Sequence, residues 1–169
     1  MPNRLLADTA DRANCRGLYE DLPVPKTGQS LYLLDMAFLS RGEKCSVLLV
    51  DDHEGFRHEL RSLLAKDEEI EVIGDVCDGA RALNFLTSCE PHVVILDLNM
   101  PGMSGIEAAG VIKKSWPKVE IIGLCVMQDS FTMAAFLKAG ATAVLSKSDK
   151  PEELHSAIKR ACPRRSSAA

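Results

Sequence analysis

The chain has 169 residues, of which 46% are hydrophobic and 26% charged, and its formal net charge is −4. This composition is typical of a globular protein with room for one ordinary domain plus an appendage. The negative charge gives no basic face for nucleic acid, and no apolar segment is long enough to span a bilayer. The first twenty residues contain no apolar stretch, which excludes a secretory signal. We therefore expect a soluble, intracellular protein without direct contact to nucleic acid or membrane.

The six cysteines are scattered along the chain, without a Cys-x-x-Cys motif or a histidine pair at zinc spacing. Several lie inside apolar runs, where a cysteine behaves as a small hydrophobic residue. We interpret all six as reduced thiols in a cytoplasmic protein. They are Cys15, Cys45, Cys77, Cys89, Cys125 and Cys162.

The two ends of the chain differ from its middle. Residues 1–29 lack hydrophobic periodicity and carry prolines and many charges, which predicts loose structure. Residues 30–40 form a short apolar patch typical of a weak helix, and Met36 is an alternative translation start. We expect residues 1–44 to form a poorly structured extension and residues 163–169 a disordered tail, with no output domain after it.

Between residues 45 and 162, short apolar runs alternate with segments of helical periodicity. Five strand–helix units in succession predict a parallel sheet covered by helices on both faces. The expected fold is α/β, a three-layer doubly wound flavodoxin-like domain of the (βα)5 type with strand order 2-1-3-4-5. Strands are expected over 45–50, 70–75, 92–97, 119–125 and 141–146, and helices over 54–66, 80–86, 104–115, up to 139, and from 151 to 161.

Acidic residues follow two of the predicted strands. The first strand runs directly into Asp51 and Asp52, and the third ends at Asp97. In this strand order the topology reverses between these strands, which is where such sheets bind ligands. Three crowded carboxylates repel one another unless a cation lies among them, and Mg²⁺ accepts hard oxygen ligands of this kind. Lys147 ends the fifth strand at the same edge, so we expect a metal site at which a carboxylate attacks a phosphoryl group.

A simpler interpretation is that each aspartate only caps a helix or forms a turn. It explains any one of them alone. Three acids and a lysine at strand ends of one domain favour the functional interpretation.

Two motifs and one lysine carry a resemblance to a known family. They are Val-Leu-Leu-Val-Asp51-Asp52-His53, then Ile-Leu-Asp97-Leu-Asn99-Met100-Pro101-Gly102-Met-Ser-Gly105, and Lys147. Over about residues 45–162 the chain resembles the receiver domain of bacterial two-component response regulators, in the branch that usually carries a helix-turn-helix output domain.

The resemblance implies that Asp97 is the phosphoacceptor and takes its phosphoryl group from a histidine kinase or a phosphotransfer protein. It implies that Asp52 and Asp97 bind Mg²⁺ directly, Asp51 through water and Asn99 by its backbone carbonyl, while Lys147 pairs with the phosphoryl oxygens. The implied protein is a cytoplasmic signalling switch and not an enzyme beyond self-phosphorylation from phosphodonors and self-dephosphorylation. It would act on an unidentified downstream protein, and a homodimer is one expected assembly.

Two departures from the family pattern leave other functions open. Cys125 stands where the family has Thr or Ser, and a thiol is a weaker hydrogen-bond donor than a hydroxyl. Val144 stands at the aromatic switch position. The alternatives are a degenerate receiver that acts as a constitutive interaction module, or a fragment of a DNA-binding transcriptional regulator. An aspartate-nucleophile phosphatase ranks last, because Asn99 replaces the second acid that this class needs.

Overall fold

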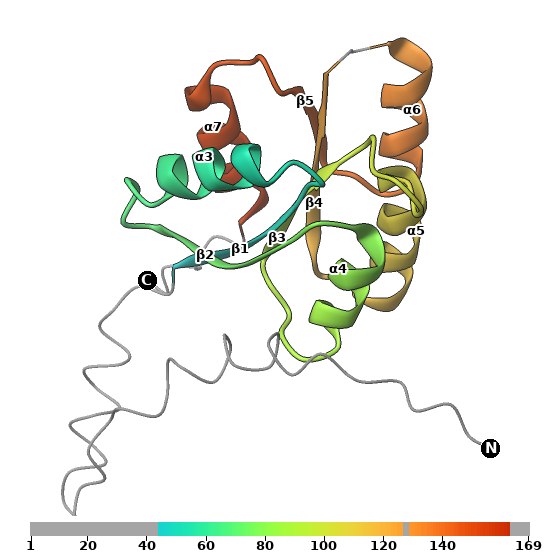
Figure 1. Ribbon diagram of the computed structural model, residues 1–169, viewed down its shortest axis with the longest axis horizontal. Helices are drawn as coiled ribbons and strands as arrows, with labels where there is room; N and C mark the ends of the chain where they lie inside the picture. Colours follow the sequence, from blue (N-terminus) through green and yellow to red (C-terminus); the bar gives the residue numbers. More distant parts are fainter. Residues whose placement is uncertain (1–43, 127–128, 163–169) are drawn as a thin grey trace, which may run out of the picture. The chain divides into compact units, whose positions relative to one another are not determined.

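The computed structural model describes residues 44–126 and 129–162, where five strands and five helices alternate (Figure 1). The expectations for residues 1–43 and for the tail lie outside the described residues. None of the described helices has both the length and the apolar character that a membrane crossing requires. The strands are β1 (Cys45–Val50), β2 (Ile70–Val76), β3 (Val93–Asp97), β4 (Glu120–Cys125) and β5 (Ala143–Ser146), and the helices are α3 (Glu54–Leu64), α4 (Gly79–Leu86), α5 (Gly105–Ser115), α6 (Ser130–Lys138) and α7 (Pro151–Ala161).

The sheet has the order β2-β1-β3-β4-β5, and all neighbouring strands are parallel, which confirms the predicted flavodoxin-like topology. The register pairs Val47 with Val93 and Val50 with Leu96. β1 and β3 therefore reach the carboxyl edge of the sheet side by side, and the residues that follow them are neighbours.

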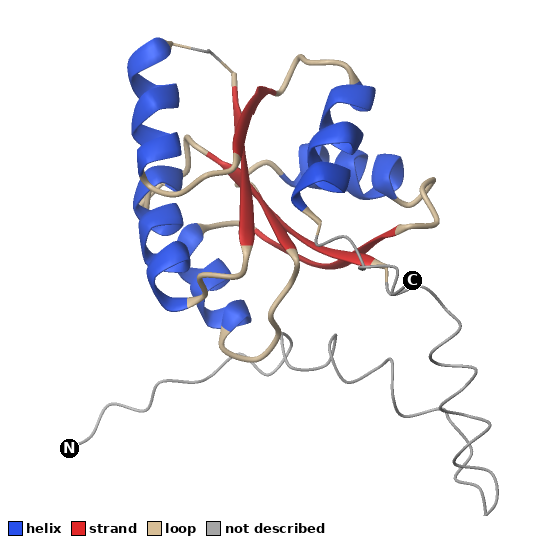
Figure 2. Cartoon of the chain, turned by 180° about the vertical axis from the view of Figure 1, so that it is seen from behind, coloured by secondary structure: helices blue, strands red, loops and turns tan. Residues whose placement is uncertain are grey.

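Helices cover both faces of the sheet (Figure 2). Because successive side chains of a strand point to opposite faces, Leu48 of β1 joins the core under α4, α5 and α6, while Leu49 joins the core under α3 and α7. On the first face the sheet packs against Phe136 of α6, and on the second against Leu64 of α3 and Ile158 of α7, all of them fully buried. This two-sided burial explains why the strands lack polar alternation.

Local signals set the helix ends. Ser104 caps α5 in a capping box with Glu107, and Pro151 occupies the first turn of α7. Gly140, with φ of 111°, follows α6 in the left-handed region that glycine tolerates. β5 begins at Ala143, two residues later than predicted, although the Thr142 N–H already donates to the Ile121 carbonyl of β4 at 2.8 Å.

The expectation that all six cysteines are reduced is wrong for two of them. Cys45 opens β1 and Cys162 follows α7, and the structure joins them in a disulfide across a sequence separation of 117. The packing of α7 beside β1 brings their Cα atoms to 5.9 Å, within the range that a disulfide spans. Within the described residues, Cys77, Cys89 and Cys125 lie outside disulfides.

Candidate functional site

The three predicted carboxylates meet at the carboxyl edge of the sheet. Asp51 follows β1 directly, Asp52 is the next residue, and Asp97 ends β3. Ligand atoms of these side chains and of the adjacent His53 all lie within 4.8 Å of one another. Asp51 and Asp97 are both only 2% exposed, so their charges are held away from bulk water.

Lys147 supplies positive charge to this cluster. Its Nζ lies 2.6 Å from Oδ2 of Asp51 and 3.0 Å from Oδ2 of Asp97. Burial alone would lower the pKa of Lys147, but the hydrogen bonds and charges of the two carboxylates outweigh burial and raise its pKa above the usual value. The ammonium also lies 4.8 Å from the ring centroid of Phe56, on the first turn of α3. Lys147 is therefore charged and held in place from three sides.

Main-chain groups orient the two buried aspartates. The Asn99 N–H donates to Oδ1 of Asp97 at 3.3 Å, and the His53 N–H donates to Oδ1 of Asp51 at 2.9 Å. Each aspartate thus has one oxygen on a backbone amide and the other on Lys147. Asn99 itself is exposed, and its expected role as a carbonyl ligand stays a prediction.

Asp52 differs from the other two carboxylates. Its Oδ1 is buried and accepts no hydrogen bond from the part of the chain that the structure describes. Nδ1 of His53 lies 2.8 Å from this oxygen but does not meet hydrogen-bond geometry, and the His53 side chain is 71% exposed. A buried acceptor without a donor is costly unless a cation binds it.

The residues present fit Mg²⁺. Three clustered carboxylates have one ammonium among them, paired with Asp51 and Asp97, which leaves excess negative charge, and the buried Oδ1 of Asp52 accepts no hydrogen bond within the described residues. Mg²⁺ prefers a few hard oxygen ligands and keeps water in its remaining positions.

Cys125, at the end of β4, is 2% exposed, and its Sγ lies 3.5 Å from the carbonyl oxygen of Leu145, to which it donates. Burial raises the pKa of the Cys125 thiol, and the carboxylates of Asp149, Asp129 and Asp97 raise it further. The thiol is neutral, and its hydrogen is directed to the main chain of β5.

Val144 packs, partly buried, against the core on the face covered by α4, α5 and α6. Cys125 ends β4 beside the site, and Val144 lies in β5, the strand that directly precedes Lys147.

Two residues of the site were missed by sequence reasoning. A guanidinium nitrogen of Arg57 donates to the carbonyl oxygen of Asp51 at 2.6 Å, and its Nε lies 3.3 Å from Oδ1 of Asp75. Phe56, whose ring lies against the ammonium of Lys147, is the second. The available signal was their position on the first turn of the helix that directly follows the acidic pair, where side chains lie over the end of the strand.

Comparisons with known proteins agree with this geometry. Residues 47–159 match the family model of the response regulator receiver domain. Response regulator UvrY of Escherichia coli K12 is 39% identical over 114 residues, which cover 68% of this chain and 52% of UvrY. Transcriptional regulatory protein DegU of Brevibacillus brevis is 32% identical over 116 residues, which cover 69% of this chain and 49% of DegU. The chain thus spans about half the length of these relatives.

A solved structure gives the same result. The two-component response regulator of the LuxR family from Aurantimonas sp. SI85-9A1 matches with a TM-score of 0.67 and 30% identity, over 70% of this chain and 84% of that one. The sheet order, the acidic cluster with its lysine and the match of the family model over most of the described residues agree with one another. The chain belongs to the family of response regulator receiver domains.

Proposed function

We propose that the chain is the phosphoacceptor of a two-component phosphorelay, in which Asp97 takes a phosphoryl group from a histidine kinase or a phosphotransfer protein. Receiver domains are signalling switches and not classical enzymes. The observation that carries the proposal is the environment of Asp97: a buried carboxylate 3.0 Å from the ammonium of Lys147, with two further carboxylates within 4.8 Å. The proposed site of action is the cytoplasm.

In the proposed step, a carboxylate oxygen of Asp97 attacks the phosphorus atom of a phosphohistidine. The P–N bond breaks, its electron pair stays on the imidazole, and the product is an aspartyl phosphate. The ammonium of Lys147 pairs with a phosphoryl oxygen, while the Asn99 N–H keeps the carboxylate oriented. Asp51, Asp52 and Asp97 would hold Mg²⁺, which neutralises charge on the transferred oxygens.

The test is phosphorylation of the full chain with a small acyl phosphate and Mg²⁺, measured by intact mass. We expect one phosphoryl adduct on the wild type and none on Asp97→Asn. Asp75→Asn is the matched control, because Asp75 is an aspartate near the end of the neighbouring β2 whose carboxylate is not part of the acidic cluster and pairs with Arg57 and Arg61. It should be phosphorylated like the wild type. Absence of an adduct on the wild type, together with absence of Mg²⁺ binding, would contradict the proposal.

A second candidate function, a degenerate receiver that binds partners constitutively, is favoured by one observation. The Cys125 thiol donates to the Leu145 carbonyl and is a weak, neutral donor for a phosphoryl oxygen. If the switch is lost, the adduct forms without a change in conformation or assembly. Hydrogen exchange of the phosphorylated and unphosphorylated chain separates the two functions.

A third possibility is that this domain serves a DNA-binding transcriptional regulator. DegU is named a transcriptional regulatory protein, and this chain covers about half of it. The 169-residue chain has a formal net charge of −4, so we expect it not to shift a DNA duplex in a gel at physiological salt. A shift would show that the chain itself binds nucleic acid.

A further inference from the structure

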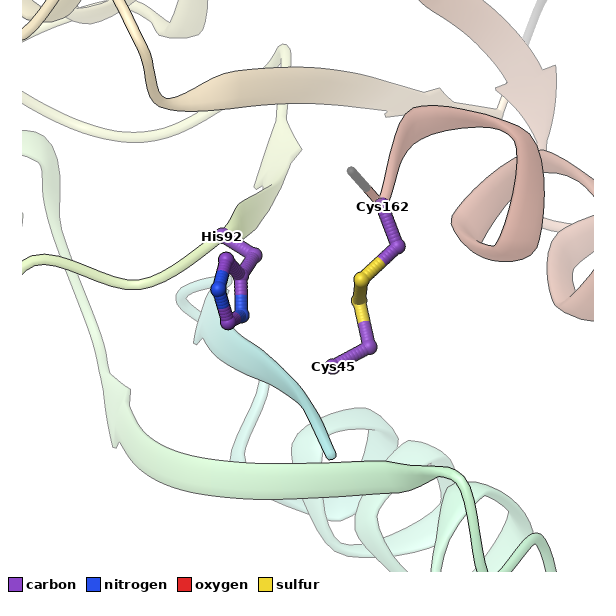
Figure 3. A group of neighbouring side chains, drawn as sticks. All are labelled: Cys45, His92 and Cys162. Atoms are coloured by element: carbon purple, nitrogen blue, oxygen red, sulfur yellow. A yellow bond between two sulfur atoms is a disulfide. The ribbon is translucent and has the colours of Figure 1, made fainter. Parts of the chain in front are cut away.

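Two cysteines and a histidine meet at the amino-terminal edge of the sheet, at the far end of β1 from the carboxylates (Figure 3). Cys45 opens β1, His92 precedes β3, and Cys162 follows α7. Their sulfur atoms and one ring nitrogen lie within 4.8 Å of one another. β1 is six residues long, so this cluster is roughly 20 Å from the site of Asp97.

The two sulfur atoms differ in access. Cys45 is 5% exposed and belongs to the core between the sheet and α7, whereas Cys162 is only partly buried. A small thiol therefore reaches the Cys162 sulfur first, and Cys45 is the sulfur that leaves. Thiol–disulfide exchange depends on such access to one sulfur and on stabilisation of the departing thiolate.

His92 favours a redox pair over a metal centre. The Ser46 main-chain N–H donates to Nδ1 of His92 at 3.0 Å, and the Ser46 hydroxyl lies 2.8 Å from the same nitrogen. Nδ1 is thus an acceptor, and the proton of the neutral ring is on Nε2. A metal ion needs a bare ring nitrogen, so it would have to displace Ser46 or that proton.

We propose that Cys45 and Cys162 form a redox-modification site, a reversible disulfide that exchanges with low-molecular-weight disulfides and fastens the end of α7 to the start of β1. On oxidation the Cys162 thiolate attacks a small disulfide and releases one small thiol. The Cys45 thiolate then attacks the mixed disulfide, releases the second small thiol and closes the bond. In a compartment that keeps thiols reduced, this pair is open and closes on oxidation.

The disulfide controls only the last turn of α7, because the rest of the helix is held independently. Leu154 and Ile158 lie in the core, and the ammonium of Lys159 lies 3.0 Å from Asp67 and 2.8 Å from Glu69. The N–H of Cys162 donates to the carbonyl of Ile158 at 2.8 Å and closes the final turn. Hydrogen exchange of this amide therefore reports whether the disulfide holds the last turn of α7 in place.

The first test equilibrates the full chain with mixtures of reduced and oxidised glutathione, alkylates the remaining thiols and maps the linked peptides by mass. We expect a single 45–162 linkage that forms at oxidising ratios and is lost at reducing ratios. Cys162→Ser should abolish it. Cys77→Ser is the matched control, since Cys77 is also partly buried but outside the disulfide, and should leave the titration unchanged. Asp97→Asn should also titrate like the wild type, so this test does not depend on the proposed phosphorylation.

Three results would overturn the proposal: linkage of any other cysteine pair, no 45–162 linkage at the most oxidising ratio, or a linkage that reducing ratios do not open. A metal centre is tested on the reduced chain with Zn²⁺ alone. Stoichiometric Zn²⁺ binding that protects both Cys45 and Cys162 from alkylation would replace the redox site by a metal site.

The effect of the disulfide on the end of α7 is tested by hydrogen exchange of the wild-type chain in its oxidised and reduced forms, which needs no substitution. We expect the amide of Cys162 to exchange at least tenfold faster after reduction, while the amides of β3 do not change. Equal exchange rates of the Cys162 amide in both forms would show that the disulfide does not hold the last turn of α7.

Discussion

Nζ of Lys147 lies 2.6 Å from Oδ2 of Asp51, although 96 residues separate them in the sequence. The contact joins the end of β5 to the end of β1, and the same ammonium reaches Asp97 at the end of β3. One cation thus balances carboxylates from two strands at the edge where the sheet topology reverses.

Replacing Lys147 by Met should lower the free energy of unfolding of the metal-free protein by about 3 kcal/mol, because breaking a buried ion pair leaves uncompensated charge. Both aspartates are buried and would lose their common partner. Saturating Mg²⁺ should restore most of this loss, since the metal replaces the missing cation. Urea unfolding with and without Mg²⁺ measures both effects.

Lys159→Met is the control for that prediction. Lys159 also pairs with two carboxylates, but its side chain is 49% exposed, so water screens the pairs. Its replacement should leave the urea midpoint and the Mg²⁺ response within experimental error. Equal losses for the two lysines would show that burial of the Lys147 cluster does not matter.

Asp52→Asn should raise the melting temperature of the metal-free protein by a few degrees, because it removes one of three mutually repelling carboxylates. The Oδ1 of Asp52 accepts no hydrogen bond from the described residues, and its contact with the largely exposed His53 ring is screened by water, so little is lost. The same variant should lose most of the stabilisation by Mg²⁺. Thermal unfolding against Mg²⁺ concentration tests both statements.

Asp75→Asn is the comparison for Asp52. Asp75 is paired with Arg57 and Arg61, so its replacement should lower the melting temperature and leave the Mg²⁺ response intact. A melting temperature for Asp52→Asn at or below that of the wild type would contradict the repulsion argument.

Asp75 also predicts a pH dependence. Burial raises the pKa of Asp75, but hydrogen bonds and charges of Arg61 and Arg57 outweigh burial and hold the pKa below its usual value. Because the pKa of Asp75 is lower in the folded state, the ionised carboxylate stabilises the folded state at a pH above the unfolded-state pKa of about 3.9. This contribution is lost as the pH falls through the folded-state pKa. At neutral pH the free energy of unfolding of the wild type should exceed that of Asp75→Asn by about 1 kcal/mol, a value that allows for screening by solvent. This difference should vanish in acid. A difference in the free energy of unfolding that does not decrease as the pH is lowered through the acid range would assign it to packing.

Cys125→Ser tests whether the weak thiol limits the switch. A serine hydroxyl is a stronger donor than the thiol that now faces the Leu145 carbonyl. The variant should form the phosphoryl adduct to the same extent as the wild type and show a larger change in hydrogen exchange at β5 on phosphorylation. Identical changes in both proteins would show that position 125 does not transmit the signal.

The fold followed from the sequence because its strongest patterns are local. The apolar runs of β1 and β3 predicted buried parallel strands, and the aspartates at their ends predicted which edge carries the site. Helix ends were marked by Ser104, Gly140 and Pro151. Each of these signals lies within a few residues of the feature that it predicts.

What the sequence did not predict depends on contacts across the fold. The disulfide needs the end of α7 to return to the start of β1, and the bond from Arg57 to Asp51 depends on how the first turn of α3 lies over that strand. The unpartnered oxygen of Asp52 depends on side-chain orientation, which no spacing in the sequence encodes.

Gly105 gives the sharpest test of how packing positions the phosphoacceptor. A β-carbon at Gly105 would overlap the carbonyl oxygen of Asp97 and lie 2.8 Å from Cα of Leu98, both backbone atoms that cannot swing away. Gly105→Ala should therefore push α5 away from the end of β3, lower the free energy of unfolding by about 2 kcal/mol and reduce phosphorylation of Asp97 severalfold.

Gly110→Ala is the matched control on the same helix, because a β-carbon there meets nothing within 4 Å. It should stabilise the chain by about 0.5–1 kcal/mol through helix propensity and leave phosphorylation unchanged. Urea unfolding and adduct formation of the two variants, measured side by side, separate close packing against Asp97 from a general effect of alanine in α5. Normal phosphorylation of Gly105→Ala would show that this contact does not position the aspartate.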